Sequence, residues 1–392
     1  MRIAIRNRVE KRFGHPIVFS SDCERLSEHI YETIGTRLSA QTLRRVFGFL
    51  SGSTQPAPHT LHILAEYCGL NSPEEFRLAE NNLSDEPQDR ASIQADIIRQ
   101  FYSIEHIPGM DYNFQNACGN IAEIICNDMP LLMELGSFLS QNPVAQVYFF
   151  ERFPYIDGLA GPYTAYLKNY MQHKEGFEPK LFVNCMLYLG AFLSQNKKEQ
   201  DLYFSQINAL PDYIQYHPFP TGRRRSIRII QAEGIERQNQ IEKAFEEELI
   251  MRKEKEVFRA TPYYPFIMVE GLNLIGEYEA ACAMINIADT FYSPITINNH
   301  MIEPGYHECF KLSRAIAYFH TGKIEQAKSI MQSINARNFV FTNHKYYSIM
   351  HTIMERKLCS ETANRKKELL LSRFRELVNE TKYTYFKLSW PT

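Results

Sequence analysis

Residues 22–76 contain a closely spaced series of helix start and stop signals, which restricts this segment to a compact helical unit. Ser21 and Glu24 have the S-x-x-E spacing of a capping box, so a helix is expected to begin near Asp22. Gly35 is expected to end it, because glycine readily adopts the left-handed conformation found just beyond helix ends. The apolar face between these signals repeats every four residues and consists of Leu26, Ile30 and Ile34.

A second helix is predicted after a tight turn, with Ser39 capping its start. Its buried stripe follows the i, i+3, i+4, i+7 spacing and consists of Leu43, Val46, Phe47 and Leu50. At roughly 100° per residue, Gln41 and Arg45 lie on the opposite face. Thr42 and Arg44 flank these two residues.

Two further helices are predicted in this segment. The core pattern of the first consists of Leu61, Leu64, Ala65 and Cys68, and Gly69 is expected to end it. Ser72 then supplies a cap, Pro73 occupies the first helical position, and a glutamate follows at the third, which predicts another helix start. Residues 1–82 are therefore interpreted as one small helical domain.

Two helices joined by a short turn, the second exposing polar and cationic side chains, have helix-turn-helix geometry. On such a helix Arg44 or Arg45 could pair with guanine, and Gln41 could pair with adenine. Cations near the chain start suit phosphate contacts: Arg2, Arg6, Arg8, Lys11 and Arg12. Residues 1–60 contain nine Lys or Arg and five Asp or Glu, against a net charge of −2 for the whole chain, which favours nucleic-acid binding at this end. The alternative is a helical module that packs on its own body or on a partner and never contacts DNA.

The stretches LSEHIYETIGTRLSAQTLRRVFGF and TLHILAEYCGLNSPEEF resemble the repressor-like (Xre-type) helix-turn-helix domain. The second stretch has the TL-x-x-LA-x-x-x-G pattern with which that domain often ends. The resemblance covers about 55 of the 392 residues, and the family's first helix is less recognisable in residues 1–20. It implies DNA binding by a recognition helix that carries Ser39, Gln41, Thr42, Arg44 and Arg45.

The length of 392 residues allows two or three domains, and a hydrophobic fraction of 44% supports a large core. No run of about 18 apolar residues occurs, and the first 15 residues lack an apolar stretch, so neither a membrane span nor a signal peptide is expected. The eight cysteines are scattered without a C-x-x-C pair, which is typical of reduced thiols. The composition therefore favours a cytoplasmic protein.

Residues 83–91 are polar and lack periodicity, so they are interpreted as a linker. Residues 92–392 have helical periodicity almost throughout and are interpreted as a second domain. Thr381–Leu388 is the exception, because its tyrosines alternate with polar residues. This tail is expected to be an extended segment that docks on the body.

Two stretches of the second domain resemble tetratricopeptide repeats, with matching residues at offsets 0, 3, 7, 12, 16 and 19. The first, within residues 266–289, contains Val269, Leu272, Gly276, Ala281, Ile285 and Ala288. The second, within residues 312–335, contains Ala315, Tyr318, Gly322, Ala327, Met331 and Ile334. The two glycines are 46 residues apart, so an insertion is expected near residues 291–305. The resemblance implies stacked helical hairpins whose groove binds a peptide or protein segment.

The sequence contains no glycine-rich phosphate loop and no G-x-S-x-G nucleophile motif. Two groups of potential metal ligands have poor spacing: His59, His62 and Cys68, and His300, Glu303 and His307. The first group offers three ligands from one helix, and Pro304 interrupts the second, so neither forms a tetrahedral cage. We therefore expect no enzyme activity, no metal and no cofactor.

The densest basic cluster of the chain consists of Arg223, Arg224, Arg225 and Arg228. Such a cluster could bind phosphate, an acidic partner or the DNA backbone. The simpler interpretation is a solvated helix start whose charge is partly neutralised by the glutamates from Glu233 onward.

Together these patterns predict an all-α, cytoplasmic regulator with a DNA-binding head and a helical-repeat body. The layout is similar to that of peptide-sensing regulators that join a repressor-like head to a tetratricopeptide body. A homodimer is expected, because palindromic half-sites in DNA require two heads. The alternative is a protein-interaction scaffold whose head does not bind DNA.

Overall fold

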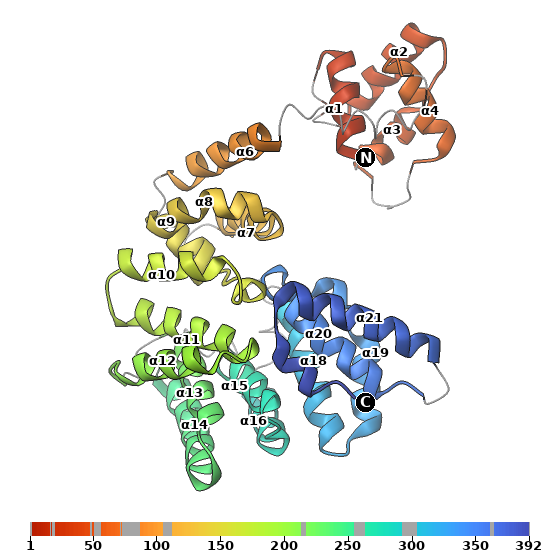
Figure 1. Cartoon of the computed structure of the whole chain (residues 1–392). Helices are drawn as coiled ribbons and strands as arrows, with labels where there is room; N and C mark the ends of the chain where they lie inside the picture. Colours follow the sequence, from red (N-terminus) through yellow and green to blue (C-terminus); the bar gives the residue numbers. More distant parts are fainter. Residues whose placement is uncertain are drawn as a thin grey trace. The chain divides into compact units, whose positions relative to one another are not determined.

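The computed structural model of the chain is all-helical, and no strand occurs in the part that it describes (Figure 1). That part comprises residues 2–15, 17, 20–47, 49–50, 56–70, 72, 87–104, 112–212, 217–254, 263–291, 304–360 and 364–391. The chain divides into two compact units, Met1–Ile93, called the head, and Gln94–Thr392, called the body. The all-α fold class predicted from the sequence is therefore confirmed.

The described helices of the head are α1 (Arg2–Phe13), α2 (Asp22–Ile34), α3 (Ala40–Val46) and α4 (Pro58–Tyr67). Gly35 ends α2 as predicted, with a φ of 70° and its N–H donating to the carbonyl of Tyr31. Ser39 caps α3 as predicted, because its Oγ accepts a hydrogen bond from the Thr42 N–H at 3.1 Å. The helix predicted to begin at Ser72 lies outside the described residues.

Two local predictions for the head are wrong. Ser21 makes no side-chain cap to α2, and the Glu24 carboxylate pairs instead with Arg44, so no capping box forms although α2 does begin at Asp22. Leu50, predicted to be buried, is 39% exposed. It lies beyond the end of α3 at Val46, so the helical spacing that would bury it no longer applies.

The core of the head draws apolar side chains from all four helices and the turns between them. Its fully buried members include Ile5, Val9, Leu26, Ile30, Leu43 and Leu64. Burial of each such side chain contributes roughly 1.5–3 kcal/mol. Ile5 and Val9 belong to α1, so residues 2–13 complete this core, although no helix was predicted there from the sequence.

The body begins with α6 (Pro87–Tyr102), which crosses the boundary between the two units. The prediction of a linker over residues 83–91 is therefore wrong from Pro87 onward, because these residues are helical. Residues 83–86 lie outside the described part. The next elements are α7 (Tyr112–Asn127), α8 (Met129–Gln141), α9 (Pro143–Ala145), η1 (Gln146–Glu151), η2 (Ile156–Gly158) and α10 (Tyr163–His173). They are followed by α11 (Phe177–Leu193), α12 (Lys197–Asn208), α13 (Pro218–Gln231), α14 (Gly234–Glu254), α15 (Tyr263–Leu274), α16 (Tyr278–Phe291), α18 (Pro304–His320) and α19 (Ile324–Ser333). The last are η4 (Ala336–Asn338), η5 (Phe341–Asn343), α20 (His344–Lys357), α21 (Asn364–Thr381) and η6 (Thr384–Leu388).

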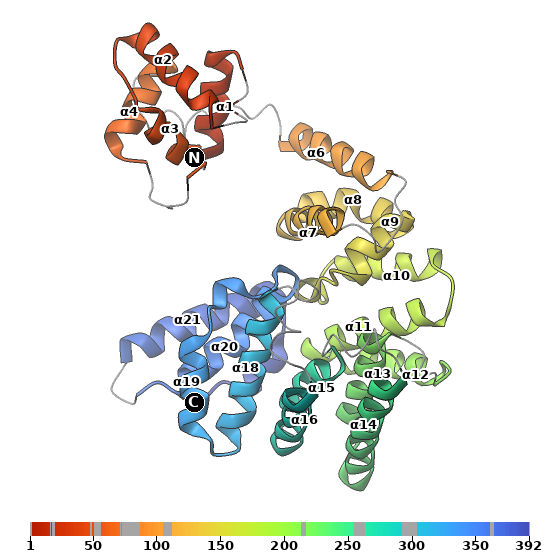
Figure 2. The ribbon, with the colours of Figure 1, turned by 180° about the vertical axis from the view of Figure 1, so that it is seen from behind.

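From α11 onward the helices of the body pack as successive pairs (Figures 1 and 2). The pairs are α11 with α12, α13 with α14, α15 with α16, α18 with α19, and α20 with α21. The first helices of neighbouring pairs also contact one another in chain order, so the pairs form a stack. This arrangement buries one helix face against the partner and another against the next pair.

The two predicted helix-glycine-helix stretches are observed. Gly276 joins α15 to α16 and Gly322 joins α18 to α19, with φ values of 83° and 81° that favour glycine. Ala281 and Ala327 are fully buried at the matching position of each second helix. The insertion predicted near residues 291–305 falls largely outside the described residues.

α13 and α15 cross closely at a glycine of α15. A Cβ on Gly271 of α15 would lie 1.9 Å from the Oγ of Ser226 on α13. Glu270, next to this glycine, forms an ion pair with Arg223 of α13 at 2.6 Å. The glycine therefore permits the close crossing that brings these two buried charges together.

The C-terminal tail docks on the body but is not extended as predicted, because residues 384–388 form the 3-10 helix η6. Three of its side chains donate to backbone carbonyls of distant segments: Tyr383 to Ile156, Thr384 to Ser194, and Tyr385 to Leu274. The tyrosines therefore alternate because their hydroxyl groups bond to different acceptors. The alternation does not indicate a strand.

Asp157 of η2 holds the start of α20 although it lies almost two hundred residues earlier in the chain. Its carboxylate accepts the backbone N–H groups of Lys345 at 2.7 Å and Tyr346 at 2.8 Å. Burial raises the pKa of Asp157 to about 7, although these two hydrogen bonds act in the opposite direction.

We predict that the free energy of unfolding falls as the pH rises from about 4 to about 7. The folded state binds the proton of Asp157 more tightly than the unfolded chain, so stability is greatest below the unfolded pKa and is lost through this window, by up to about 1.4 kcal/mol per pH unit. In Asp157→Asn this contribution should disappear, which urea unfolding at a series of pH values would measure. The exposed Asp201→Asn should keep the wild-type dependence. An unchanged pH dependence in Asp157→Asn would contradict the prediction.

Candidate nucleic-acid interface and ligand pocket

α3 exposes a short polar face. Gln41 and Arg45 are exposed and lie one helical turn apart, while Leu43 and Val46 on the other side of the helix are buried. Within the described part of the chain, neither Gln41 nor Arg45 has a hydrogen bond or ion pair. Both side chains are therefore available to a partner.

The hydroxyl groups of Ser39 and Thr42 are largely occupied by hydrogen bonds at the start of α3. Their hydroxyl groups lie 2.8 Å apart, and Ser39 also accepts the Thr42 N–H. These hydrogen bonds cap the first turn of α3, so the two hydroxyl groups serve mainly to position the helix. They have little capacity left to bind a partner.

Arg44 does not point freely outward. Its Nη2 forms an ion pair with Glu24 of α2 at 2.6 Å, and its Nε donates to the carbonyl of Ser20 at 3.2 Å. Direct base contact by Arg44, as predicted from the sequence, would require both interactions to break. Arg44 instead fixes α3 against α2 through these two contacts.

The cationic residues of α1 are also divided between internal and external roles. Arg6 pairs with Glu10 at 2.9 Å and donates to the carbonyl of Ile17, so it stabilises the head. Lys11 and Arg12 are exposed, and Arg8 is half-buried. The side chain of Arg2 lies outside the described residues. Of the predicted phosphate contacts whose side chains the structure describes, Lys11 and Arg12 are thus the most accessible.

The potential metal ligands weighed in the sequence do not form a cluster among the described residues. No group of three His, Cys, Asp or Glu side chains that could hold a metal ion occurs among the described residues, and His300 and Glu303 are not among them. Burial raises the pKa of Cys68 to about 11, although Arg8 and Arg12 lower it. This thiol therefore stays protonated near neutral pH, which disfavours both metal binding and nucleophilic reactivity.

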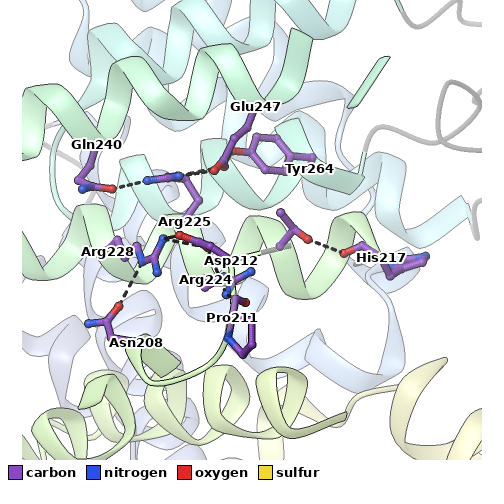
Figure 3. A network of polar contacts seen from close by, with 11 residues as sticks. Asn208, Pro211, Asp212, His217, Arg224, Arg225, Arg228, Gln240, Glu247 and Tyr264 are labelled. Atoms are coloured by element: carbon purple, nitrogen blue, oxygen red, sulfur yellow. Dashed lines mark hydrogen bonds and ion pairs between the residues drawn. The ribbon is translucent and has the colours of Figure 1, made fainter. Parts of the chain in front are cut away.

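Three of the four arginines of the α13 cluster are buried and Arg228 is partly exposed, which corrects both interpretations made from the sequence. Arg223, Arg224 and Arg225 are 3%, 3% and 6% exposed, so they form neither a solvated helix start nor an accessible basic patch. Figure 3 shows the guanidinium groups of Arg224, Arg225 and Arg228 pointing toward acceptors on neighbouring segments. These arginines hold the body together.

Arg224, Arg225 and Arg228 each have acceptors on neighbouring segments. Arg225 makes a two-point ion pair with Glu247 of α14, which also accepts the hydroxyl of Tyr264 at 2.7 Å (Figure 3). Arg224 donates to the carbonyl of Pro211 at 2.8 Å. Asp212 lies 3.2 Å from Arg224 and 2.9 Å from Arg228, which lower its pKa despite its partial burial. The α12–α13 connection and α14 are therefore fixed to α13 by charge.

The body contains a cavity of about 700 Å³ beside the beginnings of α11, α13, α15 and α18. Its aromatic walls include Tyr170, Phe177, Phe182, Phe219, Tyr263 and Tyr306. This volume lies within the range of about 300–1,000 Å³ found for ligand-binding sites. The cavity can therefore accommodate a small molecule or a short stretch of peptide.

Charged groups of both signs line the same cavity. Glu151 accepts the hydroxyl of Tyr170 at 2.6 Å and pairs with Lys174. Glu178 accepts the backbone N–H of His217, and Arg152 is exposed at the margin. A ligand that matches this lining combines apolar groups with both positive and negative groups.

Sequence reasoning did not find this pocket. Its lining comes from segments between Val147 and Tyr306, and no local motif connects them. Their aromatic residues lie near the starts of α11, α13, α15 and α18, near the end of α10 and after η1, so they come together only when the helices are stacked. The one available signal was the high content of Tyr and Phe, with 23 and 26 residues.

Comparison with models of known protein families finds no match, and neither a curated protein nor a solved structure matches the chain. In the described part of the chain, no helix is both long and apolar enough to cross a membrane.

We predict that Arg223→Met destabilises the body by about 3–5 kcal/mol, because it leaves the carboxylate of Glu270 buried without its cation. The double variant Arg223→Met/Glu270→Met should recover a large part of this loss, because no isolated charge remains. Chemical denaturation measures both values. The exposed Arg375→Met is the control and should change stability by less than about 0.5 kcal/mol. Equal destabilisation of the single and double variants would refute this account of the ion pair.

Proposed function

We propose that this chain is a transcriptional regulator that binds duplex DNA through the exposed face of α3. The observation that carries the proposal is the pair Gln41 and Arg45, which are exposed one turn apart without a partner among the described residues. Glutamine matches the donor and acceptor of adenine in the major groove, and arginine matches the two acceptors of guanine. The resemblance of residues 22–76 to repressor-like domains supports the same function.

In this proposal the other cationic residues position the head. Lys11 and Arg12 are exposed and suit contacts to phosphate, which set affinity but not sequence preference. Arg44 acts indirectly, because its ion pair with Glu24 sets the angle between α2 and α3. Loss of Arg44 is therefore expected to disturb the whole interface instead of one base contact.

We further propose that the body binds a peptide or protein segment in its aromatic pocket. The cavity volume of about 700 Å³ and the mixed charges of Glu151, Lys174 and Arg152 support this ligand class. The stacked helix pairs, which resemble tetratricopeptide repeats in two places, offer the same kind of surface. The regulator would act in the cytoplasm as a homodimer, since two-fold DNA sites need two heads.

Selection of bound fragments from a pool of random duplexes tests DNA binding and returns the preferred site. Retention of duplex at about 50 mM salt, with affinity that falls steeply as salt increases, is the expected result. If no duplex is retained under these conditions, the regulator proposal fails. The alternative is then a protein-interaction scaffold whose head packs against another protein.

We predict that Arg45→Ala and Gln41→Ala each lower the affinity for the selected site by about 10- to 100-fold, which corresponds to about 1–3 kcal/mol for a lost base contact. Binding to unrelated duplex should change much less. Fluorescence anisotropy at several salt concentrations measures both affinities. Arg375→Ala removes the same charge from an exposed site of the body and should leave both unchanged. A uniform loss for all sequences in Arg45→Ala would show that Arg45 contacts phosphate instead of bases.

A further inference from the structure

The aromatic pocket of the body contains two rows of rings that contact one another. Tyr170 lies 6.2 Å from Phe182, and Phe182 lies 6.1 Å from Phe219, measured between ring centroids. Tyr263 of α15 and Tyr306 of α18 form the second row, with a centroid distance of 6.4 Å and an edge-on geometry. The face of an aromatic ring carries partial negative charge, so walls of this kind attract a positive group as well as apolar groups.

Carboxylates outnumber cations among the described side chains that line this pocket. Glu151, Glu175 and Glu178 stand against Arg152 and Lys174, which leaves one excess negative charge. Lys174 pairs with Glu151, so these two charges neutralise each other. Arg152 and Glu175 are exposed at the margin, whereas Glu178 is partly buried. The charge that remains inside the margin is therefore the carboxylate of Glu178.

The carboxylate of Glu178 keeps acceptor capacity for a ligand. It accepts the backbone N–H of His217 at 2.5 Å, and no other hydrogen bond or ion pair of this side chain occurs in the described part of the chain. A carboxylate offers about four acceptor positions, so further donors can still bind to it. Its charge also acts on the pocket wall: burial raises the pKa of Tyr170, and the negative charges of Glu151 and Glu178 raise it further.

The helix starts around the pocket offer an anion few donors. The beginning of a helix carries partial positive charge, and α11, α13, α15 and α18 all begin beside the pocket. Anions bind such ends through free backbone N–H groups, but each of these first turns contains at least one proline, which has no N–H. The N–H of Phe219 in α13 already donates to Nδ1 of His217. The prolines are Pro179, Pro218, Pro220, Pro265 and Pro304.

We propose that the pocket binds a short peptide through a positively charged group, which enters between the aromatic walls and pairs with Glu178. The group is an ammonium or a guanidinium, supplied by the N-terminal amine of the peptide or by a basic side chain. The negative groups of the peptide stay at the exposed margin, beside Arg152. Phe177, which lines the pocket and is 49% exposed, is then covered by the apolar part of the peptide.

This inference rests on the proposed binding of a peptide by the body, and it adds the charge and the orientation of that peptide. A pool of short, apolar peptides with amidated C-termini, incubated with the full chain without DNA, tests it. The pool has four equimolar arms: a free N-terminus without lysine, an acetylated N-terminus with one lysine, an acetylated neutral peptide, and an acetylated peptide with one glutamate. Mass spectrometry of the peptides that co-elute with the protein measures the retention of each arm.

We expect one or both positive arms to be enriched by at least about tenfold over the neutral arm, because hydrogen bonds to charged groups are stronger than neutral ones. The positive arm that is retained identifies whether the N-terminal amine or a basic side chain supplies the charge.

Isothermal titration calorimetry of the most enriched peptide against variants of the chain tests the contact itself. Glu178→Gln removes the charge but keeps an oxygen that can accept the N–H of His217, so it should weaken binding by about tenfold and leave the fold intact. Arg152→Gln should not weaken binding, because this cation repels the positive group. Glu376→Gln, at an exposed site of α21, is the matched control and should leave the affinity unchanged.

Circular dichroism melting of each variant checks that the fold is unchanged. Equal retention of the neutral and positive arms overturns this inference alone, since the chain then binds peptides without a preference for charge. Preference for the glutamate arm, or an unchanged affinity in Glu178→Gln, overturns it as well. Retention of no arm removes the proposed peptide binding itself and this inference with it. Because the assay contains no DNA, a failure of DNA binding by the head cannot be mistaken for any of these outcomes.

Discussion

The arrangement of the body depends on the burial of charge along α13. Arg223 reaches α15, Arg225 reaches α14, and Arg228 reaches the connection from α12. A guanidinium removed from water must lie beside an acidic partner, because an unpaired buried charge costs several kcal/mol. Such pairs add little net stability over apolar side chains, but they disfavour any alternative packing that would separate them. Charge pairing thus specifies which helices stand next to α13, and apolar packing then stabilises them.

The C-terminal segment adds a second constraint of a different kind. In an ideal repeat protein each unit contacts only its neighbours, so the units can unfold almost independently. Here Tyr383 bonds to a carbonyl 227 residues earlier and Tyr385 to one 111 residues earlier. Asp157 likewise holds the start of α20 across 188 residues. These contacts connect distant parts of the stack, so the body is expected to unfold more cooperatively than a simple array of helix pairs.

The sequence predicts those features that depend on a few neighbouring residues. Gly35, Ser39, Gly276 and Gly322 each stand where the structure ends or caps a helix, because backbone conformation and capping are local effects. Predictions that depend on distant partners fail. Glu24 has the spacing of a capping residue, yet its carboxylate pairs with Arg44, twenty residues away, and nothing in the local pattern distinguishes these two uses. The arginines of α13 and the aromatic pocket show the same limit, since burial and cavity shape arise only when helices from separate stretches stack.

The glycine at the crossing of α13 and α15 has a consequence for the pocket. Gly271 lies eight residues, or about 12 Å, along α15 from Tyr263, which lines the cavity opposite side chains from the start of α13. A larger residue at this position would have to displace the Ser226 hydroxyl, and its Cβ would still lie 3.0 Å from the Cβ of Ser226, so the two helices would have to adjust. The position of the pocket walls therefore depends in part on a helix crossing that does not itself line the cavity. Variation in the ligands accepted by such a protein could arise from substitutions deep in its core, while every residue that touches the ligand stays the same.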